Sequence, residues 1–152
     1  MMKWTKTYEP GLGENYLEIH YKNINKETQD FINYLESKDV LMGRNETESC
    51  LIKPDDIYYC EIVDRKCYAY LRQEVWKLEE GLAELTERYE AHGFVRISKS
   101  MVVNIHKVKR IEADLNMRMR LVLLNEEMIV MSRSYRNDFY KQLKCSRMEG
   151  GK

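Results

Sequence analysis

The sequence predicts a mainly β protein with helices (β+α): one domain of short strands with a small packed helix, preceded by a strand–helix N-terminal prefix. Three observations predict this fold class. The chain of 152 residues suffices for one core with an appendage rather than for two domains. From residue 50 onward, apolar residues alternate in short runs that polar turns separate, as they do in strands. Apolar residues recur at helical spacing in the segments 25–39, 79–90 and 134–144.

The N-terminal part predicts a flexible leader, 1–14, followed by the prefix, 15–49. The leader carries the proline and glycines of a mobile terminus. In the segment 15–22, NYLEIHYK, apolar residues alternate, which predicts a strand. The segment 25–39 begins with Asn25, a good N-cap, and its apolar residues share one side. It therefore predicts a short amphipathic helix.

The first half of the body follows a polar turn at 43–49. Two alternating strands flank the polar tip 64–66, DRK. The residues EVWKL fit either a strand or the first turn of a helix. We favour a strand over 74–78 and a helix over 79–90, which ends at Gly93.

Strands follow again after Gly93. The alternation predicts them at 94–97, 108–115, 118–124 and 127–131, with turns at 116–117 and 125–126 between the last three. Helical spacing predicts a closing helix at 134–144, and the residues 146–152 are expected to form a frayed tail. The predicted body therefore spans residues 50–145.

Composition narrows the class of protein. Hydrophobic residues make up 43% and charged residues 33%, which is ordinary for a soluble globular chain. No apolar run approaches the ~18–20 residues that span a bilayer, and the N-terminus lacks the apolar core of a secretory signal. The four cysteines show no CxxC pairing, so we expect reduced thiols in a cytoplasmic protein.

The charge is distributed unevenly along the chain. Residues 1–92 hold 12 Lys/Arg against 19 Asp/Glu, whereas residues 93–147 hold 12 against 5. Clustered cations attract polyanions, and the field of a patch matters more than the net charge of the whole chain. The C-terminal third is therefore a candidate surface for a nucleic acid.

Catalysis finds little support in the sequence. The three histidines are isolated, with no HxxxH or HExxH pair, and no phosphate-binding or nucleophile motif occurs. Asp55 and Asp56 follow a proline and fit a turn better than an acid/base pair. We expect no enzyme activity, no metal and no cofactor.

Binding is better supported, by three polar clusters in the β body. They lie at 64–66, at 98–100 and at 132–134 with Arg136 close behind. Each combines a long cation with a short polar side chain, the groups that bind phosphate oxygens and base edges. One such cluster is most simply a solvated turn, but three favour duplex DNA. Lys99 stands in an otherwise apolar alternating row, which a simple strand does not explain.

These residues resemble a known family, the LytTR DNA-binding domain of bacterial transcription regulators. The carrying stretches are IKPDDIYYCEIVDRKCYAYL (52–71), GFVRISKSMVVNIHKVKRIEADLNMR (93–118) and MIVMSRSYRNDFYKQL (128–143). The resemblance implies a β fold of short strands that inserts loops, rather than a helix, into the major groove of double-stranded DNA. It also implies a homodimer on repeated half-sites.

The resemblance assigns roles residue by residue. The DNA-facing positions that it implies are Arg65, Lys66 and Cys67 on a first loop, Ser98, Lys99 and Ser100 on a second, and Arg133, Ser134 and Arg136 on a third. Lys99 would then lie on a loop and not in a strand. Arg96, Val103 and Asn104 match the same stretch, and we interpret them as structural, with Asn104 bonded to backbone.

The chain is similar to stand-alone LytTR regulators with a short prefix, because residues 1–50 are too few for the receiver domain that many members carry. The resemblance to these regulators suggests a small multi-pass membrane protein as a further partner. Two alternatives stay open: a protein-interaction or anti-regulator module that kept the fold without DNA binding, and an RNA-binding module. The RNA-binding module would need exposed stacking aromatics, for which the candidates are Tyr58, Tyr59, Tyr68 and Tyr70.

Overall fold

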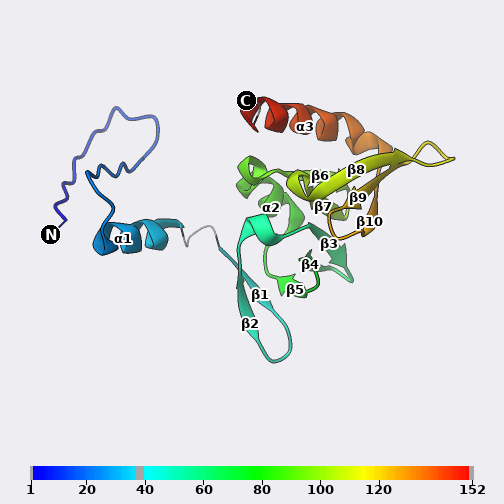
Figure 1. Cartoon of the computed structure of the whole chain (residues 1–152), viewed down its shortest axis with the longest axis horizontal. Helices are drawn as coiled ribbons and strands as arrows, with labels where there is room; N and C mark the ends of the chain where they lie inside the picture. Colours follow the sequence, from blue (N-terminus) through cyan, green and yellow to red (C-terminus); the bar gives the residue numbers. More distant parts are fainter. Residues whose placement is uncertain (1, 37–39, 151–152) are drawn as a thin grey trace. The chain divides into compact units, whose positions relative to one another are not determined.

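The computed structural model describes residues 2–36 and 40–150, which form two compact units, Met1–Asp39 and Val40–Lys152. The elements are α1 (Lys26–Glu36), β1 (Leu41–Arg44), β2 (Ser49–Ile52), β3 (Tyr59–Val63), β4 (Lys66–Tyr70), β5 (Val75–Leu78), α2 (Leu82–Arg88), β6 (Phe94–Ser98), β7 (Met101–Asn104), β8 (Val108–Ala113), β9 (Met119–Leu123), β10 (Met128–Met131) and α3 (Arg136–Gly150) (Figure 1). Short 3-10 turns follow β2, α2, β7 and β10. None of the helices in the described ranges combines the length and apolar character needed to cross a membrane.

The larger unit is built from two antiparallel sheets. One sheet has seven strands in the order β2-β1-β5-β4-β3-β7-β6, and the other has three in the order β10-β9-β8. The predicted fold class, mainly β with a few helices, is confirmed.

Two hydrophobic clusters hold this unit together. The first lies between the seven-stranded sheet and α2, where Leu85 and Tyr89 are fully buried. The second joins β6 and β7 to the three-stranded sheet and to α3, which contributes the fully buried Phe139. Burial of apolar area stabilises the folded state by about 25 cal/mol per Å². These clusters therefore hold the two sheets, α2 and α3 together.

The smaller unit confirms the predicted helix and corrects the predicted strand. The Asn25 side chain caps α1, since its Oδ1 accepts a hydrogen bond from the Thr28 backbone N–H at 2.8 Å. Residues 15–22 form no strand, so that prediction is wrong. Among residues 2–36 no second strand runs beside this segment, and Leu17 and Tyr21 on its apolar side are exposed. Alternation alone cannot supply the hydrogen-bonding partner that a strand requires.

The sheet begins earlier than the sequence indicates. The predicted polar turn at 43–49 is a hairpin, in which β1 pairs with β2 and also meets β5. Gly43 lies in β1. The position requires a glycine because a Cβ there would approach Ile52 Cδ1 and Trp76 Cβ to 2.6 Å. The glycine therefore marks a close approach inside the sheet and not a turn.

The helices of the larger unit differ from the predictions mainly at their ends. The helix predicted over 79–90 is α2, shorter and followed by a 3-10 turn, because Gly81 serves as its N-cap. Gly93 ends this region with φ of 92°, as predicted. The predicted frayed tail is helical as far as Gly150, since α3 continues through it.

Candidate nucleic-acid interface

Four turns of the larger unit meet at one end of its strands. The Ile62 N–H at the end of β3 donates to the Ser100 carbonyl at 2.8 Å, which sets the β3–β4 turn beside the β6–β7 turn. The Ser132 N–H after β10 donates to the Ile97 carbonyl in β6, also at 2.8 Å. The β8–β9 turn lies at the same end, because Met119 pairs with Met131. We call this end the loop edge.

The first predicted loop is a two-residue hairpin turn, Asp64-Arg65, closed by the pair Val63 and Lys66. Both turn residues have positive φ, 50° and 67°. Such a turn favours Asn-Gly or Asp-Gly, because a side chain at positive φ is strained. Arg65 stands where glycine would be less costly. Arg65 and Lys66 are exposed at the loop edge.

Cys67, also assigned to the first loop, lies elsewhere. Its side chain is 5% exposed and belongs to the first hydrophobic cluster with Cys60. A hydrogen bond between the two thiols, together with burial, raises the pKa of Cys60. Cys67 alternates inward after the outward Lys66, so it offers no side chain to a ligand at the loop edge.

The second loop explains why Lys99 interrupts an apolar row. The register of β6 against β7 shifts between Arg96 and Ser98, which is a β-bulge. Lys99 and Ser100 then form the exposed turn between the strands, with Ser98 half-buried at the end of β6. The bulge also leaves the Ile97 carbonyl available to Ser132.

The Arg96 side chain holds this turn in place through hydrogen bonds to its backbone carbonyls. Its Nε donates to the Ser98 carbonyl at 3.1 Å and its Nη2 to the Lys99 carbonyl at 2.5 Å. The Ser100 N–H donates to Ser98 Oγ at 3.3 Å. The turn backbone is therefore fixed while the Lys99 side chain extends from it, and the structural interpretation of Arg96 is confirmed.

The third loop follows β10 as a 3-10 turn, Arg133–Tyr135, which leads into α3. Arg133, Ser134 and Arg136 are exposed. Arg133 Nη2 donates to the Asn116 carbonyl in the β8–β9 turn at 2.9 Å, which uses one edge of its guanidinium. Arg136 lies over the Tyr140 ring, 5.9 Å from the centroid.

The predicted cations of the loop edge form no ion pair with a carboxylate in the described ranges, a condition that they share with several other cations of this unit. These predicted cations are Arg65, Lys66, Lys99, Arg133 and Arg136. By contrast, Lys109 pairs with Glu126, and Arg110 with Glu112. Unpaired cations on fixed turns are suited to phosphate oxygens and guanine edges.

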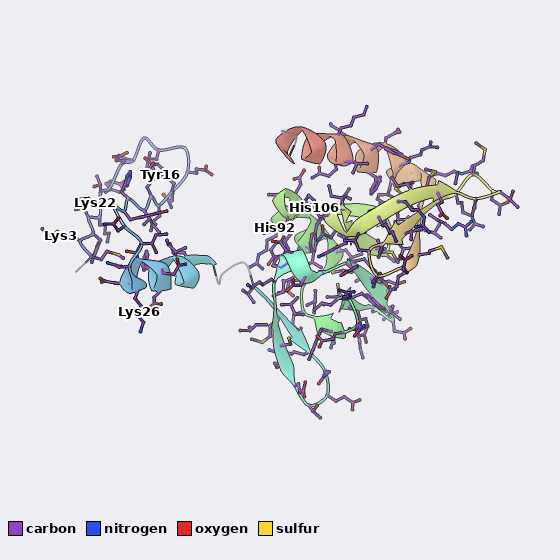
Figure 2. The ribbon with its side chains drawn as sticks, viewed as in Figure 1. Lys3, Tyr16, Lys22, Lys26, His92 and His106 are labelled. Atoms are coloured by element: carbon purple, nitrogen blue, oxygen red, sulfur yellow. The ribbon has the colours of Figure 1, made fainter. Side chains whose placement is uncertain are left out.

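Asn104 confirms its predicted structural role at the opposite end of β7. The side chain is 1% exposed. Its Nδ2 donates to the Ile57 carbonyl at 3.0 Å, and its Oδ1 accepts from the His106 N–H at 3.0 Å. Gly93 packs against the His106 ring here, and His92 lies nearby, paired with Asp55 at 3.0 Å (Figure 2).

The tyrosines considered for RNA stacking are largely used inside the protein. Tyr58 and Tyr59 are buried. Tyr59 and Tyr70 stack on each other with centroids 4.4 Å apart, and burial together with a hydrogen bond to Glu127 raises the pKa of Tyr59 above its ordinary range. Tyr58 and Tyr59 thus offer no open face to a base.

Sequence reasoning missed the β8–β9 turn as part of this edge. Residues 116–117 were predicted only as a turn and Leu115 as the end of the strand before it, whereas Asn116 contacts Arg133 directly. Two large apolar side chains, Leu115 and Met117, stand exposed there. Apolar residues inside an otherwise polar turn were the signal that could have identified it.

Comparison with known proteins agrees with the architecture. Residues 47–144 match the family described as LytTr DNA-binding domain. The chain is 27% identical over 146 residues to an uncharacterized HTH-type transcriptional regulator of Staphylococcus aureus, which covers 94% of this chain and 99% of the relative. It is also 27% identical over 96 residues to the sensory transduction protein LytT of Enterococcus faecalis, covering 63% of this chain and 40% of that protein.

The fold is also known from a solved structure. A LytTr DNA-binding domain from Bacillus cereus superimposes with a TM-score of 0.65 at 24% identity, covering 69% of this chain and 96% of that one. At this identity the likeness concerns the fold. Together with the match over residues 47–144, it completes the assignment: the chain belongs to the family of the LytTR DNA-binding domain.

Proposed function

We propose that the protein is a transcription regulator that binds specific double-stranded DNA through its loop edge, inserting loops into the major groove as a homodimer on repeated half-sites. The observation that carries the proposal is the meeting of three cation-bearing turns at one end of the strands, tied by the Ile62–Ser100 and Ser132–Ile97 backbone hydrogen bonds. Its contacting residues are Arg65, Lys66, Ser98, Lys99, Ser100, Arg133, Ser134 and Arg136.

The three turns suit different contacts. Arg133 is anchored through one nitrogen to Asn116, so the rest of its fork can be presented in a fixed direction. A guanidinium fork matches O6 and N7 of guanine. Lys99 has a fixed backbone and a mobile ammonium, which suits a phosphate. We assign base reading to Arg133 and phosphate binding to Lys99.

The backbone conformation of Arg65 also supports the proposal that the loop edge binds DNA. A residue in the left-handed region costs roughly 1 kcal/mol or more relative to glycine. Strain of this kind gathers at functional sites, where the side chain does something that glycine cannot. An arginine retained at the tip of the first loop fits contact with DNA.

The test is selection of bound sites from random duplex DNA with the full chain. The expected result is a motif of two similar half-sites. The matched variants are Arg133→Ala at the loop edge and Arg72→Ala, an exposed arginine at the opposite end of β4. Arg72→Ala should recover the same motif as the natural chain. Recovery of random sequence by a folded natural chain would instead favour an interaction module without DNA binding.

Dimeric binding is argued from the small size of one edge. Specific protein–DNA interfaces usually bury on the order of 1,000 Å² or more of protein surface, and two copies on two half-sites supply what three short turns lack. Footprinting at saturating protein should protect both half-sites. Protection of one half-site alone would contradict the dimer.

The cellular setting follows from the proposed ligand. A regulator that binds the bacterial chromosome acts in the cytoplasm, and its chemistry is binding rather than catalysis. The small multi-pass membrane partner is proposed on the resemblance to stand-alone regulators. Membrane-fraction co-purification with the tagged chain tests it, and a chain found wholly free of that fraction would remove it.

A further inference from the structure

We infer that the β8–β9 turn is a fourth DNA-contacting element, in which Leu115 and Met117 lie against the 5-methyl groups of thymines beside the contact made by Arg133. The inference rests on the proposed function and extends it to apolar readout, which the three cation-bearing loops do not supply. Figure 1 shows this turn, drawn in yellow, reaching beyond the strands that carry it.

The first observation is exposure. Leu115 is fully exposed and Met117 is 71% exposed. Met117 also has φ of 59°, the position of a three-residue hairpin loop where glycine is favoured. The turn thus holds two large apolar side chains in water, one of them at a backbone cost. Neither packs in either hydrophobic cluster.

The second observation is that the turn is well ordered by its own hydrogen bonds. Asp114 Oδ1 accepts from the Asn116 and Arg118 N–H groups, both at 2.9 Å. These bonds, led by that from Arg118, lower the pKa of Asp114. The two apolar side chains are therefore presented on a fixed frame, which reduces the entropy lost on binding.

The third observation is continuity with the proposed interface. The Asn116 carbonyl accepts the hydrogen bond from Arg133. An open groove of about 390 Å³ runs between the turn and the third loop, and Arg118 and Arg133 both line it. Whatever Arg133 contacts in a DNA groove lies next to this turn.

Charge selects DNA over a protein as the occupant. The carboxylates of the hairpin, Glu112 and Asp114, are already paired with Arg110 and Arg118, so they do not repel phosphates strongly. Arg133, which has no carboxylate partner in the described ranges, contacts the turn through the Asn116 carbonyl. Beside the DNA contact proposed for Arg133, apolar side chains meet the apolar group that the major groove offers, the thymine methyl.

The experiment uses the full chain and the duplex recovered by selection from random DNA, with thymines replaced one at a time by deoxyuridine, which lacks only the 5-methyl group. Burial of one methyl is worth roughly a fourfold change in Kd. The natural chain should lose about that factor at one or two thymines next to the base pair that Arg133 reads. Leu115→Ala should lose a similar factor on the thymine duplex and nothing further on the deoxyuridine duplex.

The matched control is Leu51→Ala, an exposed leucine (72%) on the edge strand β2, which should keep the natural pattern. Both leucines are exposed, so thermal melting should match for the three proteins. The inference fails if the natural chain binds but ignores every deoxyuridine, or if Leu115→Ala binds the thymine duplex normally. Equal deoxyuridine sensitivity in a weakened Leu115→Ala would mean that Leu115 does not act through a thymine methyl, and it would also overturn the inference. A natural chain that selects no motif removes the proposed function itself.

Discussion

The two ends of the β6–β7 hairpin hold polar side chains under opposite conditions. At the open end, Asn104 is buried and its amide group bonds to backbone on both sides, at Ile57 and His106. At the closed end, Lys99 is exposed and has no ion pair among the described residues. The comparison teaches that a polar residue in an apolar row is structural where the protein satisfies its hydrogen bonds, and free for a ligand where it does not.

The largest effect that tests this comparison is expected at the open end of the hairpin, on stability. Asn104→Ala leaves the buried Ile57 carbonyl and the part-buried His106 N–H without their partner. We therefore expect the free energy of unfolding, measured in urea, to fall by roughly 2–4 kcal/mol. Ser100→Ala at the closed end is the control, with an expected change within about 0.5 kcal/mol. Equal effects at the two positions would show that the two ends do not differ in this way.

Arg133→Ala carries the next largest effect, on binding instead of stability. We expect a loss of ~1–3 kcal/mol at one base position of the selected site, because the guanidinium fork is lost. The melting temperature of Arg133→Ala should match that of the control variant Arg72→Ala. Competition with single-position variants of the site measures the effect. Uniform weakening on every sequence would make Arg133 a phosphate contact.

Arg65→Gly should move stability and binding in opposite directions. Relief of the left-handed conformation should raise the free energy of unfolding by on the order of 0.5–1 kcal/mol. Loss of the cation should weaken binding to DNA. Urea unfolding and fluorescence titration of the same preparation measure both. A variant that gains stability and keeps full affinity would remove the first turn from the interface.

Lys99→Ala should change binding evenly. A phosphate contact weakens selected and scrambled duplexes alike, and its loss flattens the slope of log K against log salt by about one unit. The measurement is a salt titration of both duplexes with the natural chain alongside. Loss confined to the selected duplex, with an unchanged slope, would make Lys99 a base reader.

The smallest effect concerns acidity at the β8–β9 turn. The pKa of Asp114 is lowered in the folded chain, first by the Arg118 N–H. Its contribution to the turn is therefore full above the ordinary carboxyl pKa of about 3.9, and it is lost as pH falls through the lower, folded value. Amide exchange at Asn116 and Arg118 should quicken only at the acid end, relative to other turns. Asp114→Asn, which keeps an accepting oxygen, should show no such dependence.

Much of the fold could be predicted because its signals are local. The Asn25 cap, the Gly93 helix end and the strands after Gly93 each depend on neighbouring residues. The β1 strand could not be predicted in this way, because Gly43 is explained by Ile52 and Trp76, the latter more than thirty residues away along the chain. The segment 15–22 failed for the complementary reason, since it has the alternation but no partner strand within residues 2–36.

The candidate site divides in the same manner. The three polar clusters are visible in the sequence, but their meeting at one edge depends on backbone contacts between segments far apart. Cys67 was misplaced because its inward direction is set by pairing with β3 and by the position of Cys60. No local pattern in the sequence indicates that the turn at Leu115 lies beside Arg133.

The two ties between the turns, Ile62 N–H to Ser100 carbonyl and Ser132 N–H to Ile97 carbonyl, join backbone to backbone. No side chain of a tip takes part in these two bonds, so substitution of Arg65 or Lys99 leaves both bonds in place. In evolutionary terms, the side chains at the tips can change independently of the spacing between the turns. On the proposed function, descendants of such a protein can acquire new operator sequences by single substitutions at the tips, while the backbone bonds keep the spacing between the turns.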